Sequence, residues 1–511
     1  MTGRFPRMLQ DPVLIARWLR ERVTGDLRTD SRQVGPGDAF IAWPGAATDG
    51  RRFLANALSQ GAAACLLEAE GAEAWADLLA ADGQQHPGRL ACVPDLKPLT
   101  GPIADAWYER PSEDITVLAV TGTNGKTSTA WWLAQALSQA GCPCGLVGTL
   151  GTGRPPQLES TGMTTPDPVR LQRAFRDFAD RGWRHGAIEA SSIGLAEHRL
   201  AGTRIQVAVF TNFTQDHLDY HASMDAYWAA KRALFDWPGL QAAVVNVDDP
   251  QGAVLAHALQ SRPELALWTC SRRDASARLL GERLTCPRGL TMRVHEAGQS
   301  QLLETDLIGD YNLDNLLGVI GALRASGLDL TRAVQACAAL SPVPGRMQRV
   351  PAGEQQPAVV VDYAHTPDAV SQALAALAPL ARERGGRLWC LIGCGGDRDP
   401  HKRPLMAAAA ERGGDAVVLT SDNPRSESPE QILQQMQQGL RDPQAAQVIV
   451  DRAEAIAWVV QQAQPQDVVL LAGKGHESTQ EIAGRLLPFS DVEHAEQALA
   501  LRSTGAQEVS A

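Results

Sequence analysis

The sequence lacks any long apolar run, and no stretch approaches the roughly 18 residues that a membrane-spanning helix needs. Its first residues also lack the apolar core of a secretory signal peptide, because charged residues such as Arg7, Asp11 and Arg17 interrupt them. Nine cysteines are scattered without the paired spacing of a zinc site, which indicates reduced thiols. We therefore expect a soluble, cytoplasmic protein.

The sequence also has fewer basic than acidic residues, with 47 Lys and Arg against 58 Asp and Glu. The net charge of −11 argues against a nucleic-acid groove, although a local basic pocket could still hold an acidic ligand. With 511 residues the chain exceeds what one hydrophobic core supports, so we expect three domains. We expect these domains to belong to a monomer.

The most informative stretch is Ala119-Val-Thr-Gly-Thr-Asn-Gly-Lys-Thr-Ser128, which lies between an apolar run and a helical pattern. Backbone N–H groups of a glycine-rich turn and the positive end of a helix dipole bind phosphate. Lys126 adds a charge to this cradle, and Thr127 is able to hold Mg²⁺. The usual phosphate loop has another glycine where Val120 stands, so this loop is a shortened variant. The alternative is an ordinary turn between a strand and a helix.

Strands and helices alternate along the chain, which indicates an α/β fold. We expect a smaller N-terminal α/β domain at residues 1–110, a central domain with the parallel sheet of a P-loop ATPase at 111–342, and a C-terminal Rossmann-like domain at 343–511. Residues 111–114 are interpreted as a linker, and residues 279–301 as hairpins. Residues 39–43 form an apolar run, and the predicted strands lie at residues 63–67, 145–149, 186–190, 207–211, 242–247, 359–361, 388–392, 416–420 and 468–472.

Polar clusters follow the strands of the central part. Glu189 and His217 are candidate ligands for a hard cation beside phosphate, although Glu189 could instead be a helix N-terminal charge and His217 a structural histidine. Lys231 lies in a helical pattern with few polar residues, which alone predicts a side chain that reaches out to solvent. Asn312 and Asn315 could contact a base or ribose, or merely cap a helix.

Two other regions could hold ligands. In the N-terminal part, Asp30, Ser31 and Arg32 suit a polar or phosphorylated ligand, and a solvated turn is the alternative. In the last part, polar turns follow each strand, and a doubly wound sheet gathers such turns at one edge. There Arg398 and Arg425 are able to bind a carboxylate, while Asp422 and Glu477 are able to bind an ammonium group. These charges predict a site for an amino acid.

In this order the clusters resemble the Mur ligase family, ATP-dependent enzymes that extend the peptide of peptidoglycan precursors. The resemblance rests on Thr121-Gly-Thr-Asn-Gly-Lys-Thr127, Glu189-Ala-Ser-Ser192, Asn212 to His221, Gly309 to Asn315, Gly345-Arg346 and Asp362-Tyr-Ala-His365. Two further motifs, Asp422-Asn-Pro-Arg425 and Gly473-Lys-Gly-His-Glu477, are similar to those of members that add the third residue. Arginine in the first motif is typical of members that add meso-2,6-diaminopimelate instead of lysine.

The resemblance implies ATP and two Mg²⁺ ions as cofactors, with UDP-N-acetylmuramoyl-L-alanyl-D-glutamate and meso-diaminopimelate as substrates. It implies a reaction through an acyl phosphate, with Lys126, Glu189, His217 and Lys231 as catalytic residues. Thr127 and Glu189 would hold one Mg²⁺, and a carbamylated Lys231 with His217 would hold the second. The implied contacts to ATP are Gly122, Thr123, Asn124, Gly125, Lys126, Thr127, Ser128, Asn312, Asn315, Arg346 and Asp362. Those to the UDP-linked dipeptide are Thr29 and Ser31 at the uridine end, with Thr164, Thr165, Ser191, Glu197 and Arg199 at the muramoyl dipeptide. Those to diaminopimelate are Arg398, Asp422, Asn423, Pro424, Arg425, Gly473 and Glu477.

The sequence departs from the family at two positions. Ile193 stands where many members have histidine, and Glu197 where some have glutamine. Three other functions stay open: the lysine-adding member of the family, a ligase similar to folylpolyglutamate synthetase, and a nucleotide-dependent switch without bond-forming chemistry.

Overall fold

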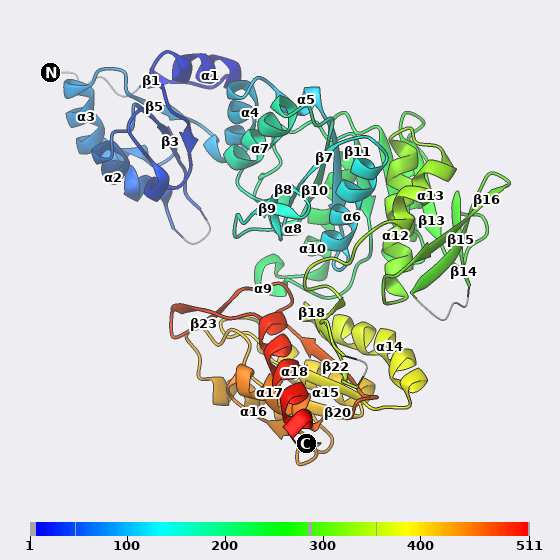
Figure 1. The fold of residues 1–511 in the computed structure, drawn as a ribbon. Coiled ribbons are helices and arrows are strands. Elements are labelled where there is room, and N and C mark those ends of the chain that lie inside the picture. The colour runs from blue at the N-terminus through cyan, green and yellow to red at the C-terminus, as the bar shows by residue number, and fades with distance from the viewer. Residues whose placement is uncertain (1–6, 46–47, 285–288, 354, 509–511) are drawn as a thin grey trace.

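The structure, a computed structural model, describes residues 7–45, 48–284, 289–353 and 355–508. The chain forms three large sheets that follow one another in sequence order, each with helices packed against it (Figure 1). The α/β fold and the three-domain architecture are therefore confirmed. The boundaries after residues 110 and 342 stay predictions.

The N-terminal sheet has five parallel strands in the order β1-β5-β4-β3-β2. Its strands are β1 (Arg7–Met8), β2 (Leu27–Arg28), β3 (Ala39–Ala42), β4 (Ala64–Glu68) and β5 (Leu90–Val93). Its helices are α1 (Pro12–Arg20), α2 (Leu54–Ser59), α3 (Ala76–Gln85) and α4 (Leu96–Trp107). The apolar run at 39–43 corresponds to β3, and the strand predicted at 63–67 corresponds to β4.

The central sheet has eleven strands in the order β16-β15-β14-β13-β12-β11-β6-β10-β7-β8-β9. The seven strands from β14 to β7 in this order are parallel, and antiparallel hairpins extend both edges. Its strands are β6 (Thr116–Thr121), β7 (Cys144–Gly148), β8 (Gly151–Arg154), β9 (Gln157–Glu159), β10 (His185–Glu189), β11 (Val207–Phe210), β12 (Ala242–Asn246), β13 (Ala266–Ser271), β14 (Leu279–Leu284), β15 (Leu290–Glu296) and β16 (Gln299–Thr305). The hairpins predicted at 279–301 are present, while the β8–β9 hairpin was not foreseen.

Helices cover both faces of this sheet, which explains why its strands read as continuous apolar runs. Along β6, Leu118 and Val120 face one core, and Val117 and Ala119 face the other. The first core is closed by α6 (Lys126–Gln139), α12 (Tyr311–Ala325) and α13 (Leu330–Ala338). The second is closed mainly by α7 (Pro168–Asp180) and α11 (Pro250–Leu259). The shorter helices are α5 (Pro111–Asp114), α8 (Ser192–Ala196), α9 (Leu218–His221) and α10 (Met224–Arg232).

Residues 111–114, interpreted as the linker into the central domain, form the short helix α5. Pro111 and Ser112 are buried, and the Ser112 hydroxyl accepts a 2.9 Å hydrogen bond from the Arg204 N–H. Proline suits the first turn of a helix because the N–H it lacks has no partner there anyway. The connection between the first two domains is therefore anchored to the central one.

The C-terminal sheet has the order β17-β18-β22-β19-β20-β21, and all its pairs except β17–β18 are parallel. Its strands are β17 (Gln348–Arg349), β18 (Ala358–Asp362), β19 (Leu388–Ile392), β20 (Ala416–Leu419), β21 (Gln447–Val448) and β22 (Val468–Ala472), with a separate hairpin β23 (Thr479–Ile482) and β24 (Arg485–Pro488). Helices α14 (Pro367–Arg384), α15 (Lys402–Gly413) and α16 (Pro429–Gln437) pack on one face, and α17 (Arg452–Gln462) and α18 (Asp491–Glu508) on the other.

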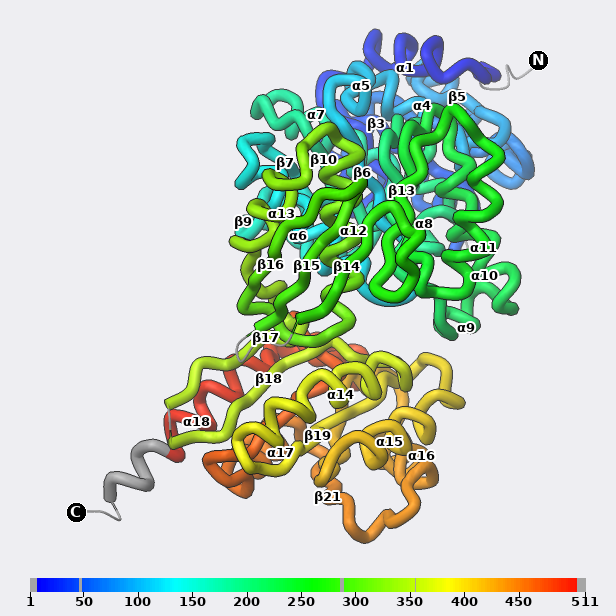
Figure 2. Tube along the Cα trace, turned by 90° about the vertical axis from the view of Figure 1, so that its right-hand side faces the viewer, coloured from blue at the N-terminus to red at the C-terminus, as the bar shows by residue number. Residues whose placement is uncertain are grey.

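The C-terminal domain lies against the central domain, and the chain crosses between them near β17 (Figure 2). A side-chain hydrogen bond of 3.4 Å, from Asn124 Nδ2 to Asp368 Oδ2, joins the phosphate loop to the start of α14. The ends of strands from two sheets therefore meet at this interface. Within the described residues, no helix is long and apolar enough to cross a membrane.

Candidate active site at the interface of the central and C-terminal domains

The phosphate loop connects β6 to α6, and two of its glycines cannot be replaced without displacing neighbours. A Cβ on Gly122 would lie 1.9 Å from Thr211 Oγ1, and one on Gly125 would lie 2.3 Å from Asn315 Oδ1. Both glycines also have positive φ angles, of 150° and 83°. Glycine tolerates this backbone because it has no side chain to clash. The loop is thus wedged between the end of β11 and helix α12.

Lys126 follows this loop as the first residue of α6. Its Nζ atom donates to the carbonyl oxygens of Gly122 and Thr123, at 3.0 and 2.8 Å. Burial lowers the pKa of Lys126, while the carboxylates of Glu189 and Asp216 oppose that shift. The amine is therefore held over the loop, where a phosphate group would meet it.

Glu189, at the end of β10, and Thr127, in the first turn of α6, lie next to each other. Thr127 Oγ1 donates to Glu189 Oε2 at 2.8 Å, and the backbone N–H of Thr149 donates to Oε1 at 2.8 Å. The Glu189 side chain is buried, and its hydrogen-bond donors among the described residues are all neutral. A buried carboxylate without a cationic hydrogen-bond partner is costly, so hydroxyl and carboxylate oxygens here suit a divalent cation.

The prediction that the Lys231 side chain reaches out to solvent is wrong. Lys231 is 1% exposed, and its Nζ atom lies 2.6 Å from the Gly122 carbonyl oxygen and 4.4 Å from the ring centre of Tyr227. Burial lowers the pKa of Lys231 well below its ordinary value, and the nearby charge of Lys126 lowers it further. Helix α10 directs this lysine inward, so its amine forms a hydrogen bond with the backbone of the phosphate loop.

His217 is a neighbour of the same tyrosine. The rings of His217 and Tyr227 are 5.9 Å apart, and His217 Nε2 is 3.6 Å from Asp216 Oδ2. Burial lowers the pKa of His217 to about 4, so the ring is neutral at pH 7. A neutral imidazole is the form that binds metal ions. Tyr227, whose hydroxyl lies 3.1 Å from Thr123 Oγ1, thus contacts the loop, the lysine and the histidine.

A cavity of about 520 Å³ lies beside the phosphate loop and contains most residues expected to contact ATP. Asn312 and Asn315 line it from α12, and Asn315 Nδ2 donates to Asn312 Oδ1 at 3.0 Å. Arg346 and Asp362 line it from the C-terminal side. Arg346 Nη2 donates to Thr127 Oγ1 at 3.3 Å, which connects the two sides directly. Asn124, Gly125 and Ser128 complete the wall.

Most residues expected at the muramoyl dipeptide form one cluster next to Glu189. Thr165 Oγ1 lies 2.9 Å from Ser191 Oγ, and Arg199 Nη1 donates to the Thr165 carbonyl oxygen at 2.8 Å. Thr164 joins this group through a 3.0 Å hydrogen bond with Thr149.

Glu197, by contrast, already has partners. Its carboxylate forms a 2.7 Å ion pair with Lys97 and a hydrogen bond with the Tyr220 hydroxyl. Burial opposes ionisation, but these two partners keep the pKa of Glu197 below its ordinary value. Thr29 and Ser31 lie in the N-terminal domain, where Asp30 caps the short turn that Ser31 begins. Among the described residues, no hydrogen bond or ion pair joins Thr29 or Ser31 to the Glu189 cluster.

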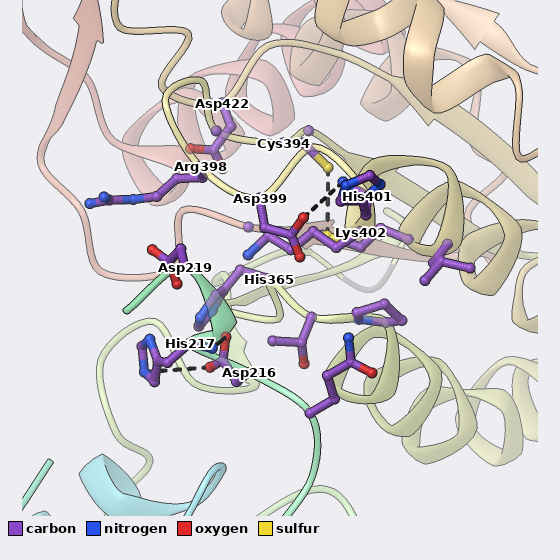
Figure 3. A pocket seen from close by; sticks show the side chains of 18 of the residues that line it. Asp216, His217, Asp219, His365, Cys394, Arg398, Asp399, His401, Lys402 and Asp422 are labelled. Carbon is purple, nitrogen blue, oxygen red and sulfur yellow. Dashed lines mark hydrogen bonds and ion pairs between the residues drawn. The ribbon is translucent and has the colours of Figure 1, made fainter. Parts of the chain in front are cut away.

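A second cavity, of about 480 Å³, contains the charged residues of the C-terminal turns. In Figure 3, Asp422 and Arg398 lie on one side of it, and Asp216 and His217 of the central domain lie on the opposite side. Of the residues expected at diaminopimelate, those that line the cavity are Arg398, Asp422, Asn423, Arg425, Gly473 and Glu477. Pro424 is buried and is not part of the wall.

Within this cavity Glu477 is already paired. Its Oε2 atom accepts from Lys474 Nζ at 2.7 Å and from Asn423 Nδ2 at 2.8 Å. Gly473 has a φ of 112°, and a Cβ there would lie 2.6 Å from Asp422 Oδ2. Among the described residues, no group donates a hydrogen bond to the Asp422 carboxylate within the chain. Asp422 is therefore the carboxylate that is open to a ligand.

Sequence reasoning assigned no role to Tyr363 and His365, although their side chains line both cavities. His365 Nδ1 lies 2.7 Å from the Tyr363 carbonyl oxygen, and Arg346 lies over the Tyr363 ring at 4.5 Å. Both residues directly follow strand β18, and ligands bind beyond the carboxyl ends of parallel strands, so their position could have indicated a role in binding. Lys474 and Tyr227 were also missed, because a buried lysine or tyrosine in a polar turn or helix has no distinctive spacing.

Comparisons with known proteins agree with this arrangement. Residues 26–85, 120–323 and 345–475 match the descriptions "Mur ligase family, catalytic domain", "Mur ligase middle domain" and "Mur ligase, glutamate ligase domain". A UDP-N-acetylmuramoyl-L-alanyl-D-glutamate–2,6-diaminopimelate ligase of Acidovorax sp. (strain JS42) is 59% identical over 493 residues, which cover 95% of this chain and 96% of that protein. A solved structure described by the same enzyme name is 36% identical, with a TM-score of 0.63 over 94% of this chain and 95% of that one. The MurF ligase of Thermotoga maritima in complex with ADP is 17% identical, with a TM-score of 0.62 over 95% and 99% of the two chains, and shares the fold.

Proposed function

The chain belongs to the Mur ligase family, and from that premise we propose that it joins meso-2,6-diaminopimelate to UDP-N-acetylmuramoyl-L-alanyl-D-glutamate. It is an ATP-dependent ligase that forms a peptide bond. One observation carries the choice of amino acid. A cavity beside the nucleotide cavity is lined by two arginines and an open carboxylate, Arg398, Arg425 and Asp422. Compared with an amino acid that has an uncharged side chain, diaminopimelate has one more carboxylate and one more ammonium group. The arginines are opposite in charge to the carboxylate, and Asp422 is opposite in charge to the ammonium group.

In the first step, the γ-carboxylate of the D-glutamyl residue attacks the γ-phosphorus of ATP, and ADP leaves. Two anions must approach each other, so the step needs positive charge and N–H donors placed in advance. The loop from Gly122 to Gly125 and the N-terminus of α6 supply the donors, and Lys126 supplies the charge. Asn312, Asn315, Arg346 and Asp362 would hold the rest of the nucleotide.

The residues present fit Mg²⁺, because Thr127 and Glu189 offer buried hard oxygens, and the hydrogen-bond donors to the Glu189 carboxylate among the described residues are all neutral. We assign one ion to this pair, and a second to His217 and a carbamylated Lys231. When bound, Mg²⁺ neutralises charge on the phosphates. Carbamylation requires an unprotonated amine, and burial of Lys231 favours that form. A carbamate on Lys231 would add a carboxylate oxygen to this site, which suits a hard cation.

In the second step, the amine of diaminopimelate attacks the carbonyl carbon of the acyl phosphate, a proton is lost from nitrogen, and phosphate leaves. The acyl phosphate would hydrolyse in water, so the two cavities must be closed while it exists. Tyr363 and His365 line both cavities, so an amine bound in one cavity would lie next to a nucleotide bound in the other. Closure of the C-terminal domain on the central domain would exclude water at this stage.

The UDP-linked dipeptide would extend from Glu189 toward the N-terminal domain. Thr164, Thr165, Ser191 and Arg199 would hold the muramoyl-dipeptide part, and Thr29 and Ser31 the uridine end. The carboxylate of Glu197 is engaged by Lys97 and Tyr220, so we assign Glu197 to the support of this wall instead of direct contact with an anionic substrate.

The decisive experiment offers the purified protein the UDP-linked dipeptide, ATP and Mg²⁺, with either meso-diaminopimelate or L-lysine. We expect a tripeptide product with diaminopimelate and little with lysine. Absence of product with both amino acids would reject the proposal. Release of ADP without dependence on an amino acid would favour a nucleotide-dependent switch, and activity on folate alone would favour a folylpolyglutamate synthetase.

The variant Arg425→Ala separates the two third-residue ligases. If Arg425 binds the second carboxylate of diaminopimelate, its loss should raise the KM for diaminopimelate by about 100-fold, the cost of a charge-assisted pair. Turnover of lysine should not fall in parallel. A lysine-adding enzyme would show an unchanged preference.

A further inference from the structure

The two loops that carry Arg398 and Arg425, residues 393–399 and 422–427, are bonded to each other along their length. The Gly396 N–H donates to the Asn423 carbonyl oxygen at 2.9 Å, and Arg425 Nη1 donates back to the Gly396 carbonyl oxygen at 2.6 Å. A Cβ on Gly396 would lie 2.0 Å from the Pro424 carbonyl oxygen. The two backbones thus approach as closely as glycine allows, and a shift of one loop must move the other.

Behind this contact lies an ion pair that no step of the proposed reaction uses. Arg403 of α15 is 1% exposed, and its guanidinium binds both carboxylate oxygens of Glu427, at 2.7 and 2.8 Å. The same guanidinium donates to the Gly395 carbonyl oxygen at 3.1 Å and to Gln435 Oε1 at 2.7 Å. Glu427 Oε1 also accepts from the Asp397 N–H at 2.6 Å. The pair therefore contacts the first loop at two points and belongs to the second.

The geometry of the pair suits the placement of other groups. A planar guanidinium that binds both oxygens of a carboxylate has a fixed orientation, which a lysine ammonium does not. The hydrogen bond to Arg403 holds the pKa of Glu427 below its ordinary value, so the Glu427 carboxylate is ionised at neutral pH. Asp397 and Arg425 have left-handed backbones, with φ of 53° and 52°, a conformation that other contacts must maintain. Neither Arg403 nor Glu427 lines the cavity.

We propose that Arg403 and Glu427 are positioning residues, which set the separation of Arg398 and Arg425 and thereby select an amino acid with a second carboxylate. This inference rests on the proposed function, because it takes Arg398 and Arg425 as the carboxylate-binding pair. A free carboxylate ligand has two oxygens at a fixed distance, and recognition by two arginines requires their guanidiniums at a matching distance.

The test uses Glu427→Gln in the full-length enzyme. Glutamine keeps the size of the side chain but removes the charge and one of the two acceptors. We expect the KM for diaminopimelate to rise about tenfold or more, from the loss of a hydrogen bond to a charged group. The KM for ATP and for the UDP-linked dipeptide should change less than about twofold, because the nucleotide cavity is unaffected. Where lysine is turned over, its kcat/KM should stay constant.

The conservative variant Arg403→Lys keeps the positive charge but loses the planar guanidinium that binds both oxygens of Glu427. It should raise the KM for diaminopimelate as well, and the double variant Arg403→Lys/Glu427→Gln should cost no more than the larger single change, since both remove one interaction. The matched control is Arg324→Lys. Arg324 also binds both oxygens of a carboxylate, that of Glu296, and a carbonyl oxygen, but it lies in the central domain outside both cavities.

The control should lower the melting temperature without changing the KM for diaminopimelate. If Glu427→Gln lowers the melting temperature and leaves that KM unchanged, or raises the KM for all three substrates equally, the pair is merely structural and the inference fails.

If Glu427→Gln does not fold, Ser426→Ala takes its place. Ser426 is exposed, and its hydroxyl donates to Asp397 Oδ1 at 2.6 Å, so its loss should give a smaller rise in the same KM. Wild-type enzyme that forms no product with diaminopimelate would reject the proposed function, whereas active wild type with an unaltered variant rejects this inference alone.

Discussion

The Nζ atom of Lys231 lies 2.6 Å from the carbonyl oxygen of Gly122, 109 positions earlier in the chain, so a buried amine is bonded to the backbone of the phosphate loop. If this amine carries a carbamate in the working enzyme, carbon-13 bicarbonate should give a carbamate signal that Lys231→Ala abolishes. We expect that variant to lose at least about 100-fold in kcat, the scale of losing one charged group at the reaction centre.

Lys231→Arg is the matched control for this prediction. Arginine has a long basic side chain like that of lysine but does not form a carbamate, so this variant should be as inactive as the alanine variant. Full activity of Lys231→Arg, or a bare amine in the mass of active enzyme, would contradict carbamylation.

Glu189 gives a second prediction. The variant Glu189→Gln keeps the hydrogen bond with Thr127 available but removes the charge that favours a cation. We expect kcat to fall by about 10²- to 10³-fold, as for other lost electrostatic contacts in active sites, and half-maximal activity to need more Mg²⁺. Steady-state rates over a Mg²⁺ titration measure both effects.

Glu197→Gln is the comparison for that titration. It makes the same chemical change in a carboxylate whose partners are Lys97 and Tyr220. Its Mg²⁺ requirement should equal that of the wild type. A similar shift in both variants would mean that Glu189 acts through the general charge of the site and holds no ion.

The sequence predicted the sheets better than it predicted the site. Strands β19 and β22 are found at the expected residues, because strands that are buried on both faces are continuous apolar runs between polar turns. The antiparallel hairpin β8–β9 was missed, since the glycines at positions 151 and 153 weaken any strand pattern. The alternation of strands and helices predicted that the C-terminal polar turns lie at one edge of the sheet, and the family resemblance implied which ligand each turn contacts.

The direction in which side chains point was the main feature of the site that the sequence did not predict. Lys231 was expected at the surface because a lysine in an amphipathic helix usually extends to water, yet tertiary packing buries it against Tyr227. Glu477 is expected to bind an ammonium group of the substrate, and this stays a prediction; in the fold the ammonium of Lys474 also contacts it. Tyr227 lies one turn before Lys231 on the same helix, so the spacing was visible, but the burial of that helix face against the distant Gly122 was not.

His476 predicts a pH dependence of stability. Burial lowers the pKa of His476 to about 4 from its ordinary value of 6.5. Between these values the unfolded chain binds a proton that the folded chain does not, so the free energy of unfolding should decrease as pH falls from 6.5 toward 4. His476→Gln should reduce this slope in denaturant titrations. The exposed His257→Gln should leave it unchanged, and equal slopes in all three proteins would contradict the prediction.

A further prediction concerns the buried pair Arg452–Asp491. Both side chains are 0% exposed, and the Arg452 guanidinium binds both Asp491 oxygens at 2.7 Å. Arg452→Met leaves an uncompensated buried carboxylate, which should cost about 3–5 kcal/mol of stability. The double variant Arg452→Met/Asp491→Leu should recover most of that loss. Hydrogen exchange of α17 and β22 measures the change, and a double variant no more stable than the single one would contradict the explanation.

Tyr363 and His365 belong to the walls of both cavities, so the two ligands cannot bind independently if either displaces these rings. Thermodynamic linkage makes this coupling reciprocal. If bound nucleotide changes the affinity for the amino acid by some factor, bound amino acid changes the affinity for the nucleotide by the same factor. A single compound that joined a nucleotide to a diamino acid across these two rings would gain the benefit of a high local concentration at both sites.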